Sequence, residues 1–241
     1  TCSKNLARRL KMLRPPLRQK AGHTGMGGRM AMHTDPVLTL AQWFSPSFPI
    51  GAFAYSHGVE QAISDGQITD AATLSDWVET ALRYGSGWND AVFLAAAYGG
   101  DAAQVDAYAR AFAASKERLS EANLQGAAFG KIAADLTGHD LGGYLYPVAV
   151  GRAAQLTALP LPLTVSMFLQ AFVSSLVSVG IRLIPIGQTD GHRIIAALSP
   201  MCTDIAALAQ SGDLADLSST AFLSDVAAMR HETLTSRVFR T

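Results

Sequence analysis

Beyond residue 34, apolar side chains recur along the chain at the spacing of an α-helix. In residues 69–85, five of them lie three or four positions apart and so share one helical face: Leu74, Trp77, Val78, Ala81 and Leu82. Asp35 before Pro36 is typical of a helix start, because the carboxylate can accept from free backbone N–H groups and proline needs no partner there. The spacing therefore predicts amphipathic helices that bury one face.

Similar patterns predict a helix from residue 36 and further helices over 53–66, 69–85, 89–100, 101–116, 117–137, 144–158, 161–181, 191–199, 202–211 and 218–231. Almost no stretch alternates with the two-residue period of a β-strand. The sequence thus predicts an all-α fold, with a single helical-bundle domain of about ten helices over residues 35–241.

The most apolar stretch carries no charged side chain from residue 153 to residue 181, which is long enough to suggest a membrane span. A polar stripe runs along it, because Ser166, Gln170, Ser174 and Ser178 recur every fourth residue, and small side chains let another helix approach closely. The flanks lack an aromatic belt and a cluster of cations. We therefore expect a central core helix or a subunit interface, with no membrane contact.

Composition supports a globular chain in a reducing compartment. Of the 241 residues, 49% are hydrophobic and 16% charged, which is enough for a large packed core. The two cysteines, Cys2 and Cys202, lie far apart and form no CxxC pair, so neither a disulfide scaffold nor a structural zinc site is expected. A cytoplasmic location follows from this cysteine usage.

The formal net charge of zero hides a split along the chain. Eight of the 19 basic groups and none of the acidic groups lie in residues 1–34, so the remainder carries a balance of −8. A basic arm could bind nucleic acid or an anionic membrane. However, this arm has no aromatic side chain to stack on bases, and Pro15, Pro16 and a glycine-rich stretch interrupt it. We expect a disordered extension and no nucleic-acid partner.

Catalytic and cofactor signatures are weak. The stretch "GAAFGKI" lacks the spacing and the hydroxyl residue of a phosphate loop, and "GMGGRM" lacks the last glycine of a dinucleotide fingerprint. His57 and Glu60 are three positions apart on a predicted helix, so a helical metal-dependent enzyme that uses both is an alternative hypothesis. The favoured interpretation of His57 is a helix-start side chain that bonds backbone. We expect no catalytic, metal or cofactor site.

Three segments are unusually specific for loops. The first, "SPSFPIGAFAYSHGVE" at 45–60, is here called the opening segment, and it places large apolar groups beside Pro46, Pro49 and Gly51. The second is "RLIPIGQTDGHR" at 182–193. The third is "RHETLTSRVFRT" at 230–241, here called the tail, with Val238 and Phe239 among cations. Such a tail is either a solvated chain end or a segment that orders when a partner binds, and the apolar pair favours ordering on binding.

Together, in this order, the three segments resemble the urease accessory protein UreF family, and "YLYPVAVGRAA" at 144–154 adds a fourth match. The resemblance runs from about residue 36 to the last residue. The basic arm has no counterpart in it. Departures are mild, since His57 replaces a glutamine and Val238 a leucine.

The resemblance implies an all-helical, dimeric urease maturation chaperone that is not an enzyme. It implies binding to the UreD/UreH scaffold, recruitment and regulation of the GTPase UreG, and nickel insertion into apo-urease. The positions that match the family motifs, and that we therefore expect to bind partners, are Tyr55, Glu60, Arg182, Gln188, Asp190, His231, Glu232, Arg237, Phe239 and Arg240. Phe48, Ile50 and Phe53 are expected to lock the opening segment into the bundle.

Overall fold

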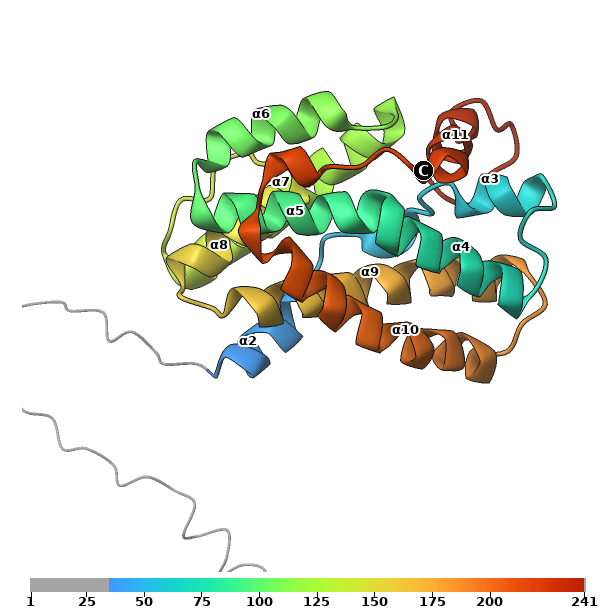
Figure 1. Ribbon diagram of the computed structural model, residues 1–241, viewed down its shortest axis with the longest axis horizontal. Coiled ribbons are helices and arrows are strands. Elements are labelled where there is room, and N and C mark those ends of the chain that lie inside the picture. The colour runs from blue at the N-terminus through green and yellow to red at the C-terminus, as the bar shows by residue number, and fades with distance from the viewer. Residues whose placement is uncertain (1–34, 241) are drawn as a thin grey trace, which may run out of the picture. The chain divides into compact units, whose positions relative to one another are not determined.

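The computed structural model describes residues 35–240, which belong to one compact unit, and all regular structure in that range is helical (Figure 1). The basic arm lies outside the described residues. The helices are α2 (Pro36–Trp43), α3 (Val59–Ser64), α4 (Ala71–Tyr84), α5 (Ser86–Gly99), α6 (Ala102–Phe112), α7 (Lys116–Thr137), α8 (Tyr146–Leu156), α9 (Leu161–Leu183), α10 (Gln188–Leu208) and α11 (Phe222–His231). Short 3-10 turns cover Ala52–Ala54, Ala209–Ser211 and Leu214–Asp216. The prediction of an all-α fold of about ten helices is confirmed for this range.

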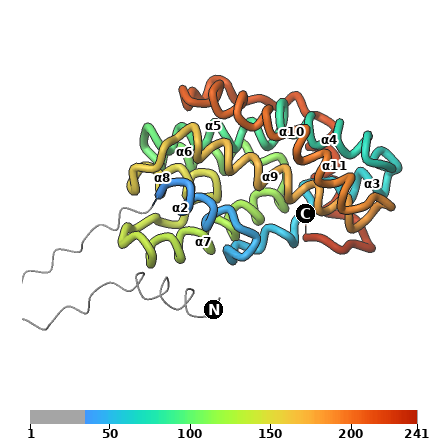
Figure 2. The backbone as a smooth tube through the Cα atoms, turned by 90° about the horizontal axis from the view of Figure 1, so that it is seen from below, coloured from blue at the N-terminus to red at the C-terminus, as the bar shows by residue number. Residues whose placement is uncertain are grey.

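Helix α9 runs through the middle of the bundle, where α2, α3, α4, α5, α8 and α10 contact it (Figure 2). Its buried side chains include Val165, Leu169, Val173 and Leu176, which are fully shielded from solvent. Within the described residues, α9 and α10 are long and apolar enough to cross a membrane by length and composition alone. The packing of α9 against helices on several sides shows instead that its apolar surface forms the core, as the sequence predicts.

Side-chain caps fix where several helices begin. The Asp35 carboxylate accepts from the Val37 N–H at 2.8 Å, and Pro36 occupies the first turn of α2 as expected. At the start of α4, Asp70 and Thr73 form a reciprocal capping box, in which each side chain accepts from the backbone N–H of the other residue. These local contacts therefore fix the first residues of α2 and α4.

Several predicted helix boundaries are wrong: the predicted helix 101–116 ends at Phe112 and the predicted helix 218–231 begins at Phe222, and two further differences have a clear structural cause. The predicted helices 191–199 and 202–211 are one continuous helix, α10, which passes through Pro200. A proline inside a helix removes one backbone hydrogen bond, but packing of α10 along α9 compensates for that loss. The predicted helix 53–66 begins only at Val59, because His57 and Gly58 both adopt positive φ angles, of 53° and 81°, and interrupt it.

Only some of the apolar side chains of the opening segment pack into the core. Phe48 is buried, with its ring centroid 5.6 Å from that of Phe129, and Ile50 is partly buried. Phe53, however, is 70% exposed, so the expectation that it locks the segment into the bundle is wrong. The positive φ of Gly51, 74°, starts the 3-10 turn that carries Phe53 outward.

Helices α5 and α8 approach so closely that one residue between them must lack a side chain. A Cβ atom built on Gly151 of α8 would lie 2.2 Å from the carbonyl oxygen of Leu94 in α5, well inside van der Waals contact. The carbonyl belongs to a helix backbone and has little freedom to move. Gly151 therefore sets the distance between two central helices.

We expect Gly151→Ala to lower the free energy of unfolding by about 1–3 kcal/mol, because the helices must separate to admit the methyl group. Gly99→Ala, where a Cβ atom meets nothing within 4 Å, is the matched control and should change stability by less than about 1 kcal/mol. Denaturant unfolding of both variants measures the difference, and equal stabilities would contradict the close approach.

Candidate functional site

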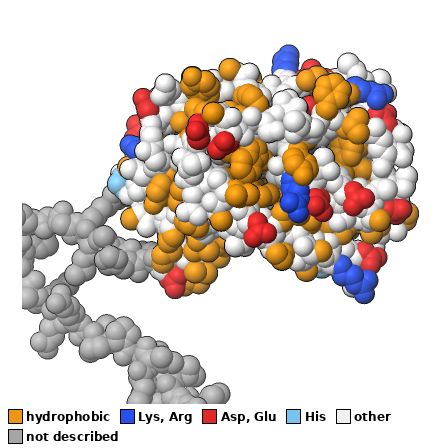
Figure 3. Space-filling view, viewed as in Figure 1, with side chains coloured by type: hydrophobic (Ala, Val, Ile, Leu, Met, Phe, Trp, Pro, Cys, Tyr) orange, Lys and Arg blue, Asp and Glu red, His pale blue; other side chains and the backbone are white. Residues whose placement is uncertain are grey.

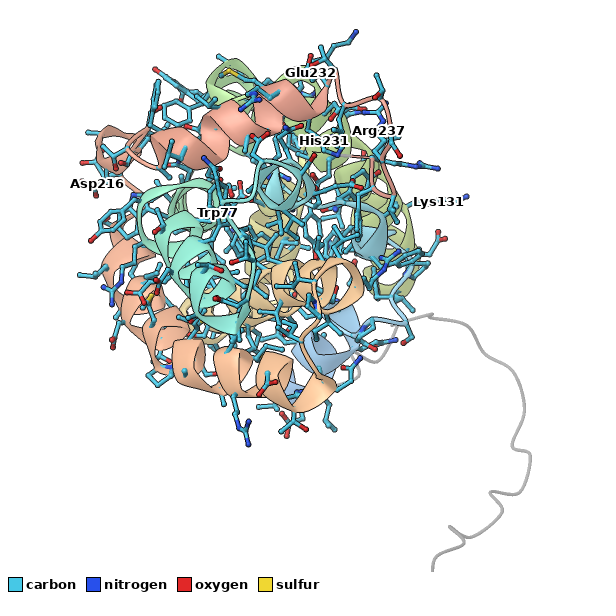
Figure 4. All side chains as sticks on the ribbon, turned by 90° about the vertical axis from the view of Figure 1, so that its right-hand side faces the viewer. Trp77, Lys131, Asp216, His231, Glu232 and Arg237 are labelled. Carbon is cyan, nitrogen blue, oxygen red and sulfur yellow. The ribbon has the colours of Figure 1, made fainter. Side chains whose placement is uncertain are left out.

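The tail returns to the opening segment, although about 180 positions of sequence separate them. Helix α11 packs against α3 and α7, and backbone N–H groups of the chain after it donate to Ala54 and Glu60. The backbone N–H of Arg240 donates to the carbonyl oxygen of Ala54 at 2.8 Å. Figure 4 shows His231, Glu232 and Arg237 gathered at one place on the molecule, away from Asp216. The structure thus joins the opening segment and the tail into one surface.

Glu60 of α3 binds the backbone of the tail through hydrogen bonds. Its side chain is buried, and its carboxylate accepts from the backbone N–H groups of Val238 at 2.6 Å and Phe239 at 2.9 Å. The same carboxylate lies 3.0 Å from Nε2 of His231. A buried carboxylate needs donors of this kind, so Glu60 and the tail stabilise each other.

His231 is fully buried at the end of α11 and lies between two carboxylates. Its Nδ1 is 2.8 Å from Glu117 of α7, and Glu117 also accepts from the guanidinium of Arg237 at 2.5 Å. Glu60, Glu117, His231 and Arg237 are here called the tail clasp. Glu232 lies outside the clasp, where its carboxylate accepts from the backbone N–H of Lys116 and caps the start of α7.

Arg182 covers the tail from the end of α9. Its guanidinium lies 4.3 Å from the centre of the Phe239 ring, and it donates to the Phe53 carbonyl oxygen at 3.1 Å. Phe239 is 3% exposed, whereas Val238 next to it is 64% exposed. A guanidinium over an aromatic face is a favourable arrangement. Arg182 therefore stabilises the tail through the ring of Phe239, whereas Glu60 of the clasp binds the backbone N–H of that residue.

The remaining predicted residues are placed differently. Gln188 and Asp190 lie in the first turn of α10, where Asp190 pairs with Arg193 at 2.8 Å. No hydrogen bond or ion pair joins either of them to the tail within residues 35–240. Tyr55 is only 5% exposed, so in this structure its ring packs inside the protein and Phe53 presents the segment's outer surface.

Glu117 was not among the predicted site residues. The sequence shows it only as an acidic residue in the first turn of a helix, which is a common stabilising position. Its contacts with His231 and Arg237 span more than 110 positions. No local pattern could have revealed that partnership.

A second buried charge cluster lies on the next turn of α7. Arg118 pairs with Glu121, His57 Nε2 lies 2.8 Å from Glu121, and Asp90 of α5 lies 3.8 Å from Arg118. Burial alone would raise the pKa of Glu121, but Arg118 and then His57 outweigh it and lower that pKa to about 2. Burial, followed by the charge of Arg118, lowers the pKa of His57.

The metal-enzyme hypothesis required His57 and Glu60 to face one ion. The two side chains instead serve different clusters, since His57 contacts Glu121 and Glu60 contacts His231 and the tail. Among the described residues, no group of three or more His, Cys, Asp or Glu side chains is placed to hold a metal ion. The hypothesis therefore loses its ligand pair.

The polar stripe of α9 faces an open groove of about 400 Å³. Gln170, Ser174 and Ser178 line this groove, together with aromatic side chains from the end of α2, the residue after it and the opening segment: Trp43, Phe44, Phe48 and Phe53. Gln170 also accepts from the Ser199 hydroxyl of α10 at 2.9 Å. The stripe thus serves helix packing on one side and leaves a groove on the other.

Tyr55 and Phe53 offer a matched pair of substitutions. Tyr55→Ala should lower the free energy of unfolding by about 3 kcal/mol or more, because it removes a buried ring. Phe53→Ala should change it by less than about 0.5 kcal/mol, because that ring is largely in solvent. Thermal or denaturant unfolding of both variants measures the two changes. A Tyr55→Ala variant with an unchanged free energy of unfolding would show that the Tyr55 ring lies on the surface.

Asp90 should make stability depend on pH. Burial raises its pKa to about 6, against the opposing charge of Arg118, whereas an unfolded chain releases this proton near pH 4. The folded state therefore binds more protons between these values, and stability should fall by about 2 kcal/mol as the pH rises from 4 to 6.

Asp90→Asn should remove this decline, while Asp190→Asn, at a partly exposed pair, should keep it. Denaturant unfolding at pH 4, 5, 6 and 7 provides the measurement. A decline of the same size in Asp90→Asn would assign the proton to another group.

Comparison with known proteins agrees with the motif match. The UreF family model matches residues 68–199, which is more than half of the chain. A urease accessory protein UreF from Ruegeria pomeroyi is 50% identical over 217 residues, which cover 88% of this chain and 100% of the relative. One from Roseobacter denitrificans is 49% identical over 216 residues, covering 88% and 97%, and one from Cereibacter sphaeroides is 47% identical over 206 residues, covering 85% and 98%. This chain belongs to the UreF family of urease accessory proteins.

Proposed function

We propose that this chain is a urease maturation chaperone that binds a UreD/UreH scaffold and recruits and regulates the GTPase UreG for nickel insertion into apo-urease. UreF proteins are non-catalytic accessory proteins, so the contribution of this chain lies in the surfaces that it presents. Membership of the family supports the role in urease maturation. The named partners are inferred from the resemblance of the three motif segments to the UreF family.

The observation that carries the proposal is the surface shared by the opening segment and the tail. Phe53 and Val238 expose large apolar groups there, beside the exposed residues Arg182 and Arg240. Aromatic and arginine side chains contribute most of the binding energy in many protein interfaces. The clasp beneath holds this surface in place, so less conformational entropy is lost when a partner binds.

Gln188 and Asp190 form a second candidate surface at the start of α10. Gln188 is exposed and Asp190 is partly exposed, and Arg182 lies six positions before Gln188 at the end of α9. Two separate surfaces suit a protein that must hold a scaffold and a GTPase at the same time. We propose that both surfaces are used in the complex.

The proposal includes a homodimer that acts in the cytoplasm, without a cofactor, nucleic-acid or membrane partner. The groove beside the polar stripe of α9 is the surface that suits an uncharged helix, because its walls combine small hydroxyl groups with aromatic rings. A partner that orders the tail remains part of the proposal. The clasp already holds the tail in the single chain, so that partner would reinforce contacts that exist.

The test is co-purification of tagged variants with UreD/UreH and UreG, followed by measurement of urease activation. The double variant Phe53→Ala and Arg240→Ala should retain at least tenfold less of one partner, with an unchanged melting temperature, because both side chains are exposed. Urease activation should fall in parallel.

Tyr108→Ala is the matched control, since this aromatic side chain of α6 is 52% exposed and lies outside both candidate surfaces. It should retain both partners. Full retention and full activation by the double variant would exclude the shared surface from the interface, whereas equal losses in the control would indicate a general effect on the fold.

A further inference from the structure

A hollow of about 270 Å³ lies where α11 meets the junction of α6 and α7, and it is here called the α11 hollow (Figure 1). Small side chains on three elements keep it open, among them Ala109, Ala114, Ala122 and Ala228. Pockets for cofactors and drug-sized ligands are usually larger, about 300–1,000 Å³. The size of the hollow therefore suits one inserted side chain.

Two carboxylates face the α11 hollow, from Asp90 of α5 and Asp225 of α11. Within residues 35–240, no donor lies within hydrogen-bonding distance of the Asp90 carboxylate, and Arg118 is 3.8 Å from it. Asp225 accepts from the Ser219 hydroxyl at a long 3.5 Å. Burial raises the pKa of both carboxyl groups, that of Asp90 to about 6, because few donors stabilise their charged forms.

Arg118 does not neutralise these two carboxylates. Its guanidinium pairs with Glu121 and also lies 3.0 Å from Nε2 of His57. Burial lowers the pKa of His57, so the ring is neutral at pH 7.5. One cation, Arg118, then stands against the three carboxylates of Glu121, Asp90 and Asp225. The hollow and the cluster beside it carry an excess of negative charge, so an entering cation would meet acceptors that lack donors.

The rim of the hollow is apolar. Phe112 at the end of α6 and Met229 of α11 both line the hollow and are exposed. The buried Phe93 supports Phe112 edge to face, with 6.2 Å between the ring centres. Figure 3 shows exposed apolar side chains in several patches on the face that carries α5 and α6. An apolar rim beside carboxylates matches an arginine side chain, which has an apolar stem and a charged head.

We propose that an arginine side chain of a partner protein enters the α11 hollow and pairs with Asp90 and Asp225. A planar guanidinium presents several donors to carboxylates and can also stack on the Phe112 ring, which the compact ammonium group of lysine does less well. Helix α11 exposes two further apolar side chains, Phe222 and Leu223. A partner protein would cover this apolar surface, whereas a small free cation would leave it in water.

This contact lies outside the two surfaces proposed above, and its test involves none of the urease partners. The probe is the peptide N-acetyl-Gly-Arg-Gly-amide, added to the full chain at pH 7.5 and low salt, where Asp90 is ionised. The control peptide carries citrulline, which has nearly the same shape as arginine and no charge. Backbone amide NMR signals of residues 111–115 and 224–229 report binding at the hollow.

We expect the arginine peptide to shift these signals with a dissociation constant of about 1–10 mM, since it supplies a single anchor. The citrulline peptide should bind at least about tenfold more weakly. Asp90→Asn and Asp225→Asn should each weaken binding of the arginine peptide about tenfold, because each removes one charge-assisted hydrogen bond.

Asp190→Asn is the matched control, because Asp190 pairs with Arg193 on α10 and should leave the affinity unchanged. Melting temperatures show whether each variant is folded, and either carboxylate variant alone suffices for the test. Equal binding of the two peptides, or unchanged affinity in the folded carboxylate variants, would overturn the proposal. Tighter binding of the free diamine putrescine would also overturn it, since the hollow would then serve a small cation.

Discussion

A carboxylate that leaves water must be met by hydrogen-bond donors, and Glu60 imposes this constraint on the whole C-terminal end of the chain. Its side chain is buried, and the donors that meet its oxygens are the Val238 and Phe239 backbones and the His231 ring. All of them come from residues more than 170 positions later in the sequence. The tail therefore supplies the donors that this buried carboxylate requires, and α3 and the tail stabilise each other.

Backbone conformation brings these partners within reach. Gly58 has a φ of 81°, and a Cβ atom built there would lie 2.8 Å from the backbone nitrogen of Ala228 in α11. Only glycine permits this approach, because any side chain would strain the backbone and push α11 away. The turn at His57 and Gly58 therefore does two things: it ends the opening segment, and it sets α3 close enough to α11 for Glu60 to meet His231.

The parts of the fold that depend on neighbouring residues could be predicted from the sequence, and those that depend on distant residues could not. Asp35, Pro36 and the central position of α9 follow from local capping and apolar spacing. The continuity of α10 through Pro200 depends on packing against α9, which no local rule includes. Likewise, Tyr55 and Phe53 are both aromatic residues near a turn, and only the path of the chain buries one and exposes the other.

Some residues of the candidate site could likewise be predicted from the sequence, and others could not. The motif match identified Glu60, His231, Arg237 and Phe239, which the structure brings together, whereas Glu117 gave no signal because its partners lie in the tail.

Helix α7 links the two buried charge clusters. Glu117 and Glu121 are four positions apart, so they share a helical face, and each accepts from a different histidine and a different arginine. Movement of α11 would thus disturb Glu117 directly, and it would disturb Glu121 through the same helix. Because these carboxylates are paired inside the protein, the surface above them retains apolar groups and guanidinium groups. On a body whose described residues are acidic overall, that cationic and apolar surface is suited to contact with a partner protein.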